Sequence, residues 1–267
     1  MEKPGCSLQM AKLSHVGRVR RFNEDAVAAD ADNGIALVAD GMGRNLSGEV
    51  AARMARDIVL GEMRAACAEP LRDPAQAVSR ALEKANRTIF AAAQENPANR
   101  GMGSTLALLL VHGDRVSLAH VGDSRVYRLR QGELNLLTRD DTLISDQVEL
   151  GLIAADQAGA SRNRHLVTQA LGAQENFEPR LREDELRPGD IFLLCSDGLN
   201  DMVDDGDIEL IVESLQINLP LAAKHLVQLA NDNGGLDNVS VVLVKTGAAA
   251  AAPRQESRFG RLLKWLR

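Results

Sequence analysis

Acidic residues recur beside short apolar runs, in contexts that suit a binding site for divalent cations. Asp40 follows an apolar run and precedes Gly41, and Asp197 likewise precedes a glycine. Glycine allows the backbone to turn tightly and to lend a carbonyl oxygen, and hard cations such as Mg²⁺ take oxygen ligands. This pattern indicates a metal-assisted hydrolase. Its acidic candidates are Glu24, Asp25, Asp40, Asp197 and Asp237.

Length and composition favour one acidic, globular unit. The chain has 267 residues, and carboxylates between positions 24 and 237 meet only if that whole span folds together. Hydrophobic residues make up 45% of the chain and aromatic residues 3%, so we expect an aliphatic core. The net charge of −6 argues against a nucleic-acid partner, because such proteins usually present a basic face.

Cysteine usage and the chain termini bear on location. Cys6, Cys67 and Cys195 are widely spaced and odd in number, which favours free thiols in a reducing compartment. No charged segment leads into an apolar stretch at the N-terminus, and no apolar run reaches about 18 residues. We therefore expect a cytoplasmic protein.

Hydrophobic periodicity predicts strands interspersed with paired helices. The helices are expected at 48–66, 74–94, 206–215 and 220–231, where apolar residues recur at helical spacing. Closely spaced turn signals indicate antiparallel hairpins, because parallel strands need long crossovers. The region 140–180 is polar and is predicted to be an insertion, with short helices near 143–151 and 154–158. Strands are expected at 8–16, 35–39, 105–110, 115–121, 125–130, 134–137, 191–195 and 239–245. These elements indicate an α+β architecture with helices covering antiparallel sheets.

Taken together, the motifs resemble those of the PPM-type (type 2C) metal-dependent serine/threonine phosphatase family. The similarity spans roughly residues 8–246, so residues 1–246 are expected to form a single catalytic domain. Its motifs are Arg-x-x-Asn-Glu-Asp at 20–25, Asp-Gly-Met-Gly at 40–43, Gly-Ser-Thr at 103–105, Gly-Asp-Ser-Arg at 122–125, Ser-Asp-Gly-Leu at 196–199 and Asp-Asn at 237–238. The resemblance implies a four-layer αββα sandwich, with two central antiparallel β-sheets flanked by helices on both faces.

The resemblance implies hydrolysis of phosphoserine and phosphothreonine by a metal-activated water at a two-metal centre holding Mn²⁺ or Mg²⁺. In it, Asp40 corresponds to the bridging carboxylate and Gly41 to the residue that lends its carbonyl. Asp197 and Asp237 correspond to ligands of one metal. Glu24 and Asp25 correspond to residues that support the other metal.

Other positions take supporting roles by the same resemblance. Arg20 corresponds to a phosphate clamp, since a planar guanidinium holds two phosphoryl oxygens, and with Asp40 it is the catalytic candidate. Asp123 matches the carboxylate that bacterial-type members use for a third metal. Asp201 and Asn238 are expected to support the ligands.

The chain departs from the family pattern at three places. Met42 stands where animal relatives have a histidine, which assigns the chain to the bacterial type and leaves the general acid unidentified. Arg44 replaces a glycine and is a candidate for substrate binding at the rim of the site. Asp140 and Asp141 stand where relatives often have Asp-His, within the 140–180 segment that forms the family's flap.

Two other functions stay open. A phosphatase-like binding module without catalysis is disfavoured because Asp40, Asp197 and Asp237 are all present. A hydrolase of small phosphate esters remains possible. As an active phosphatase, the chain is expected to act on phosphorylated proteins and to oppose a bacterial Ser/Thr kinase.

Residues 247–267 are predicted to form an alanine-rich linker and a basic amphipathic tail. Within 254–267, five basic residues and one acidic residue are interleaved with apolar side chains that include Trp265, the only tryptophan. Such a segment suits docking on an anionic membrane surface or on a protein partner. The expected location is therefore the cytoplasm, with a peripheral position at the inner membrane surface as its variant.

Overall fold

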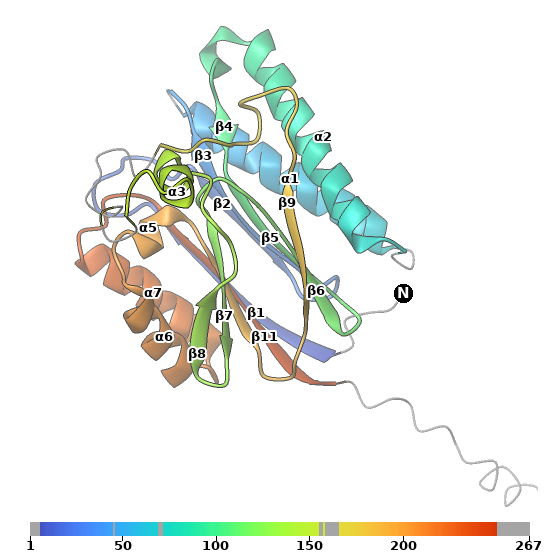
Figure 1. Cartoon of the computed structure of the whole chain (residues 1–267), viewed down its shortest axis with the longest axis vertical. Coiled ribbons are helices and arrows are strands. Elements are labelled where there is room, and N and C mark those ends of the chain that lie inside the picture. Colours follow the sequence, from blue (N-terminus) through green and yellow to red (C-terminus); the bar gives the residue numbers. More distant parts are fainter. Residues whose placement is uncertain (1–5, 45, 69–71, 155–156, 158–165, 250–267) are drawn as a thin grey trace, which may run out of the picture.

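Two antiparallel β-sheets lie face to face between two layers of helices (Figure 1). The structure, a computed structural model, describes residues 6–44, 46–68, 72–154, 157 and 166–249. The first sheet has the order β1 (Cys6–His15), β11 (Val239–Ala249), β10 (Ile191–Cys195), β7 (Arg125–Arg130) and β8 (Glu133–Leu136). The second has the order β2 (Asp25–Asp30), β3 (Ile35–Met42), β5 (Leu106–His112), β6 (Arg115–Val121) and β9 (Arg180–Glu185), with β4 (Gly103–Ser104) paired to β3.

Each sheet is covered on its outer face by helices. The long helices α1 (Ser47–Cys67) and α2 (Pro74–Glu95) pack together over the second sheet, whereas α6 (Asp205–Ser214) and α7 (Leu219–Asp232) cover the first. The short helix α5 (Asp197–Asn200) follows β10 directly. The 3₁₀ turn η1 (Pro97–Asn99) follows α2, and α3 (Leu143–Glu149) lies in the predicted insertion.

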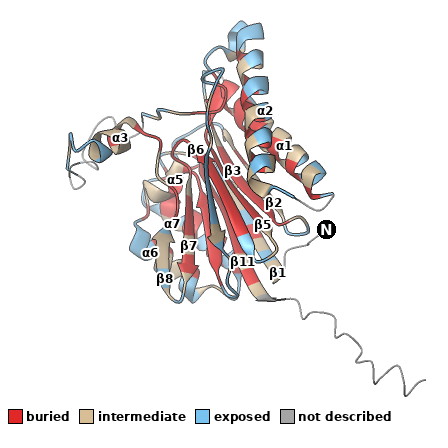
Figure 2. Ribbon diagram, turned by 45° about the vertical axis from the view of Figure 1, so that its right-hand side comes forward, coloured by how far each residue is buried: buried red, intermediate tan, exposed pale blue. Residues whose placement is uncertain are grey.

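Buried side chains form three apolar layers, which Figure 2 shows as red strands and inner helix faces. Strand β3 illustrates how a period of two residues builds them. Leu37 belongs to the layer under α1 and α2, whereas its neighbour Val38 belongs to the layer between the sheets. The third layer, which includes Tyr127, lies between the first sheet and α5–α7. This arrangement confirms the predicted four-layer αββα sandwich.

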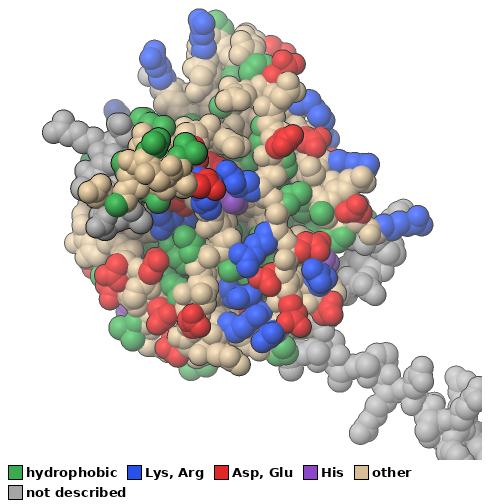
Figure 3. Space-filling model, in the orientation of Figure 1, with side chains coloured by type: hydrophobic (Ala, Val, Ile, Leu, Met, Phe, Trp, Pro, Cys, Tyr) green, Lys and Arg blue, Asp and Glu red, His purple; other side chains and the backbone are tan. Residues whose placement is uncertain are grey.

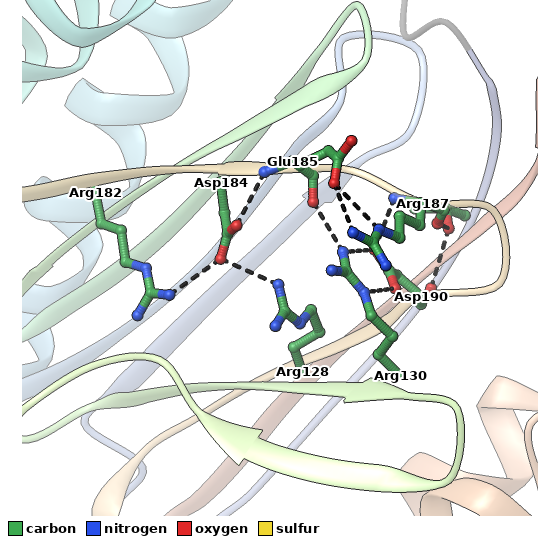
Figure 4. A network of polar contacts seen from close by, with 8 residues as sticks. Arg128, Arg130, Arg182, Asp184, Glu185, Arg187 and Asp190 are labelled. Atoms are coloured by element: carbon green, nitrogen blue, oxygen red, sulfur yellow. Dashed lines mark hydrogen bonds and ion pairs between the residues drawn. The ribbon is translucent and has the colours of Figure 1, made fainter.

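A polar network also joins the two sheets at the edge near β9 (Figure 4). Arg130 of β7 donates from Nε and Nη2 to the two carboxylate oxygens of Asp190, each at 2.7 Å, and from Nη2 to the carbonyl of Glu185 at 2.8 Å. Arg128 of the same strand contacts Asp184 of β9 at 3.0 Å. Basic and acidic side chains are intermingled on this face of the molecule (Figure 3).

Most predicted elements lie within one or two residues of the observed ones, and the strands at 115–121, 125–130 and 191–195 coincide with β6, β7 and β10. Strands β2 and β9 were not predicted. Strand β11 continues to Ala249, into the segment predicted as a linker. Most of the helix predicted at 154–158, and the whole of the basic tail at 254–267, lie outside the described residues. Among the helices that the structure describes, none has the length and apolar character needed to cross a membrane.

Candidate metal centre

A pocket of about 720 Å³ lies where strand ends of both sheets meet. Strand β3 brings Asp40 from the second sheet, while the ends of β10 and β11 bring Asp197 and Asp237 from the first. The predicted site residues that line this pocket are Arg20, Glu24, Asp40, Gly41, Asp123, Asp197, Asp201, Asp237 and Asn238. Residues more than two hundred positions apart are thus collected in one place.

The backbone of Asp40 is held firmly while its carboxylate faces the pocket. Its N–H donates to Thr105 Oγ1 at 3.2 Å, and its carbonyl accepts from Thr105 N at 2.8 Å and Ser104 Oγ at 3.1 Å. Thr105 Oγ1 is in turn bonded to Ser124 Oγ at 2.7 Å. The Gly-Ser-Thr motif therefore fixes the position from which the Asp40 carboxylate projects.

Two glycines of the motifs are required by close packing of the backbone. A Cβ added to Gly41 would lie 2.0 Å from the carbonyl oxygen of Gly48, at the start of α1. A Cβ on Gly198 would lie 2.0 Å from the carbonyl oxygen of Asn238. Any side chain at either position would push the first turn of a helix away from the acidic strand ends.

Asn238 ties the end of β11 to the segment that carries Arg20 and Glu24. Its Oδ1 accepts from Glu24 N at 2.8 Å, and its Nδ2 donates to the carbonyls of Val16 and Phe22, each at 2.9 Å. The neighbouring Asp237 accepts from Arg20 Nη2 at 2.6 Å. Arg20 is therefore held over the pocket by one of the predicted metal ligands.

Two carboxylate oxygens at the site lack the partners that buried polar atoms normally have. Asp25 is the cross-strand neighbour of Asp40, and its Oδ2 accepts from Ser196 Oγ at 2.9 Å. Its Oδ1 is buried without a hydrogen-bond partner among the described residues, and the same is true of Asp197 Oδ1. Because an unpaired buried acceptor costs about 1–3 kcal/mol, such exceptions call for an explanation.

The carboxylates also repel one another. Burial, together with the charges of Asp25 and Asp197, raises the pKa of Asp40 well above its ordinary value. The pKa of Asp197 is raised in the same way, by burial and by repulsion from Asp123. Burial raises the pKa of Asp25 to about 6. A divalent cation would relieve both this repulsion and the unpaired oxygens, so the residues fit the predicted metals.

Asp123 lies on the β6–β7 turn in its own acidic environment. Burial, followed by repulsion from Asp140, raises its pKa to about 7. Asp140 is paired with Arg125, whose Nη2 approaches it at 2.7 Å. The adjacent Asp141 accepts from Gly122 N at 3.1 Å and from Arg180 Nε at 2.7 Å, which fixes the turn that carries Asp123.

The carboxylates line the pocket rather than enclose a single point. Within the described part of the chain, no group of three or more His, Cys, Asp or Glu side chains converges closely enough to hold a metal ion by itself. Mg²⁺ commonly binds proteins through one or two carboxylates and keeps several waters, so a closed cage of side chains is not required. The argument that these residues suit Mg²⁺ or Mn²⁺ therefore depends on the unpaired oxygens and on the mutual repulsion of the carboxylates.

Two predicted residues lie elsewhere. Asp25 stands outside the set of described residues that line the pocket, although its charge acts on Asp40. Arg44 lines a separate hollow beside Arg100 and η1. A larger hollow of about 940 Å³, between α2 and the segment 168–180, contains none of the predicted ligands.

The prediction did not include several residues that shape the pocket. Leu166 and Leu236 line it with exposed apolar side chains, and Thr105 lines it beside Asp40. Thr105 belongs to a motif that could have indicated its role. The two leucines carry no sequence signal, because isolated exposed leucines are common on protein surfaces.

Comparison with known proteins agrees with this geometry. The family model described as Protein phosphatase 2C matches residues 14–229. The serine/threonine protein phosphatase PstP of Mycobacterium tuberculosis is 40% identical over 237 residues, which are 88% of this chain and 44% of that protein. The protein phosphatase PhpP of Streptococcus pneumoniae is 33% identical over 89% of this chain and 97% of its own length. The chain thus spans less than half of PstP but nearly all of PhpP.

A solved structure shows the same fold. The catalytic domain of PstP in complex with two manganese ions superposes with a TM-score of 0.80 at 39% identity, covering 90% of this chain and 98% of that one. The family match covers most of the chain and includes Asp40 and Asp197 of the acidic pocket, whereas the aligned part of PstP covers 90% of this chain. This chain belongs to the protein phosphatase 2C family.

Proposed function

We propose that this chain hydrolyses phosphoserine and phosphothreonine in proteins, with divalent cations bound in the acidic pocket. The observation that carries the proposal is the unpaired buried Oδ1 of Asp197 in the pocket over which Arg20 is held, together with the unpaired Oδ1 of Asp25, whose charge acts on Asp40 from outside the pocket lining. When bound, the cations lower the pKa of a water so that hydroxide is available near neutral pH.

We assign separate metal-binding and phosphate-binding roles to the residues at this site. Asp40 is proposed to bridge the cations and Gly41 to lend its carbonyl, with Asp197 and Asp237 as ligands from the side of the first sheet; all four residues line the pocket. Glu24 and Asp25 support the side of the second sheet. Arg20 is half exposed and is proposed to bind two phosphoryl oxygens of the substrate, exchanging its bond to Asp237 for them.

Mn²⁺ or Mg²⁺ suits this all-oxygen donor set better than zinc. The relative whose structure carries two manganese ions supports a two-metal centre here. Asp123 and Asp197, which line the same pocket, are proposed to hold a third cation, with Asp201 as a supporting residue.

Finer aspects of the function rest on the sequence alone. We propose that the chain opposes a bacterial Ser/Thr kinase in the cytoplasm, and that residues 254–267 dock on an anionic membrane or a protein partner. Anionic vesicles should shift the emission of Trp265 to the blue if the tail binds membranes. An unchanged emission spectrum would exclude membrane binding by the tail.

The decisive experiment measures hydrolysis of p-nitrophenyl phosphate and of a phosphothreonine peptide with Mn²⁺, with EDTA, and in Asp40→Asn. EDTA should abolish activity, and Asp40→Asn should lower kcat/KM by at least about a hundredfold, since even partners of metal ligands are worth 10–100-fold. Activity that survives either change would overturn the mechanism. Hydrolysis of p-nitrophenyl phosphate alone would favour a small-ester hydrolase, and activity on neither substrate would favour a binding module.

A further inference from the structure

A second, smaller hollow adjoins the catalytic pocket. It has a volume of about 240 Å³ and is lined by Arg20, Arg21, Phe22, Glu24, Gly43 and Leu46. We call it the side pocket. Arg20, Glu24 and Gly43 line both cavities, so the side pocket is adjacent to the site where Arg20 is proposed to bind phosphate. A phosphorylated segment held by Arg20 must therefore pass close to it.

Phe22 forms an exposed wall of the side pocket on a fixed backbone. Its side chain is 46% exposed in a chain with few aromatic residues. Its carbonyl accepts the 2.9 Å hydrogen bond from Asn238, and the guanidinium of Arg21 lies 5.2 Å from the centre of its ring. The ring is thus held in place at the rim without being buried in the core, as suits a contact surface.

Leu46 forms the second apolar wall at a cost to the fold. Its φ of +69° lies in the left-handed region, which leucine rarely adopts, and it occupies the N-cap of α1. Leucine has no side-chain oxygen to cap the helix, whereas glycine would suit both the backbone angle and the cap. The side chain is 38% exposed, so it contributes little core burial in return. A strained, exposed apolar residue beside a catalytic pocket indicates a role outside folding.

We propose that the side pocket receives a bulky apolar side chain of the substrate protein, within two residues of the phosphoserine or phosphothreonine. The inference rests on the proposed function and adds a substrate preference to it. The volume suits one large side chain, since sites for drug-sized ligands begin at about 300 Å³. Phe22 and Leu46 supply the apolar surface, and Arg20 links this subsite to the phosphoryl group.

The test uses phosphothreonine peptides in which one position within two residues of the phosphothreonine is alanine, leucine or aspartate. At the favoured position, leucine should raise kcat/KM over alanine by roughly tenfold, the effect of burying part of one apolar side chain. The gain should appear as a lower KM at similar kcat, since the contact is made equally in the ground and transition states.

Variants then assign the preference to the side pocket. Phe22→Ala should reduce the leucine-to-alanine ratio of kcat/KM below about threefold. Leu46→Gly should reduce it as well, while raising Tm by about 2–4 °C through relief of backbone strain. A lower leucine-to-alanine ratio together with a higher Tm in Leu46→Gly would show that Leu46 contacts the substrate and is not needed for folding. Leu210→Ala, which removes another exposed leucine on α6, should leave the ratio unchanged.

Two outcomes would overturn the proposal while leaving the phosphatase activity intact. One is equal kcat/KM for the leucine and alanine peptides at every position, or a preference for aspartate alone. The other is a leucine preference that persists in both Phe22→Ala and Leu46→Gly. Absence of Mn²⁺-dependent hydrolysis of every peptide would instead overturn the proposed function, and the substrate preference with it.

Discussion

At the scale of single residues, the site separates fixed backbone from available carboxylate oxygens. Thr105 and Asn238 satisfy the backbone groups of Asp40 and Glu24, whereas Asp25 Oδ1 and Asp197 Oδ1 remain unpaired among the described residues. Folding alone disfavours unpaired buried oxygens, because nearly all buried polar groups are bonded. The division suggests that the hydrogen-bond network is built to hold ligands for cations rather than to maximise stability.

The hydroxyl of Thr105 provides a direct test of this positioning role. Thr105→Val keeps the side-chain shape but leaves Asp40 N–H and Ser124 Oγ without their bonds to Oγ1. We expect a loss of about 1–3 kcal/mol in unfolding free energy and a drop in kcat of about 10–100-fold. Urea unfolding and steady-state kinetics measure both effects. The matched control is Thr88→Val on the surface of α2, and equal behaviour of the two variants would contradict the role.

His120 gives the molecule a specific dependence on acid. Its Nε2 bonds to the carbonyl of Arg139 at 2.7 Å, and burial lowers its pKa despite the nearby charge of Asp141. The unfolded chain therefore binds the proton more readily, with an ordinary pKa near 6.5. The contribution of His120 to stability should be complete above about pH 6.5 and should be lost as the pH falls from there through its lowered pKa.

Unfolding free energies at pH 7.5 and 5.5 measure this effect. His120→Gln, which keeps a donor for the Arg139 carbonyl, should lose less stability between these values than the wild type. The difference is bounded by about 1.4 kcal/mol for each unit that separates the folded and unfolded pKa values. His225→Gln on the exposed face of α7 is the control and should retain the wild-type dependence.

At the scale of elements, strands rich in valine, leucine and isoleucine were predictable, whereas the alanine-rich β2 and the charged β9 were not. Strand β10 is a continuous apolar run because both of its faces are buried. Strand β9 has the sequence Arg-Leu-Arg-Glu-Asp-Glu, forms the edge of its sheet and is mostly exposed. Charged side chains protect an edge strand from pairing with other chains, but they also erase the alternation that identifies a strand. Strand β9 is recognised only from its antiparallel pairing with β6 in the structure.

The link between β7 and the β9–β10 connection makes a testable contribution to stability. Asp190 is 1% exposed and accepts two hydrogen bonds from Arg130. Asp190→Ala should destabilise the protein by about 3 kcal/mol, because it leaves a largely buried guanidinium without its partner. Glu185→Ala removes an exposed ion pair with Arg187 and should change stability by less than about 1 kcal/mol. Similar losses for the two variants, measured by urea unfolding, would contradict this ranking.

At the scale of the whole molecule, the sandwich brings carboxylates of both sheets to one end. Short motifs around Asp40, Asp197 and Asp237 were enough to predict this collection, since each motif lies at a strand end. The sequence did not reveal that Leu46 adopts a strained backbone, or that Arg44 lies beside Arg100 instead of in the acidic pocket. Such details depend on how loops from distant segments pack together, and local sequence patterns do not predict that packing.

The position of the carboxylates predicts how metal removal affects the whole fold. Asp25 and Asp40 on the second sheet repel Asp197 and Asp237 on the first, and this repulsion opposes docking of the sheets in the absence of cations. Mn²⁺ at about a hundred times its dissociation constant should add about 2.7 kcal/mol to the unfolding free energy. For a chain of this size that is a rise in Tm of about 5–10 °C over the protein in EDTA.

Asp40→Asn should raise Tm in EDTA, because one repelling charge is gone, and should lose most of the rise caused by Mn²⁺. Thermal unfolding at constant ionic strength, with K⁺ replacing Mn²⁺ as the control, separates this effect from general screening. Equal Tm values with Mn²⁺ and EDTA, or a lower Tm for Asp40→Asn in EDTA, would show that the carboxylates do not act as a shared cation site between the sheets.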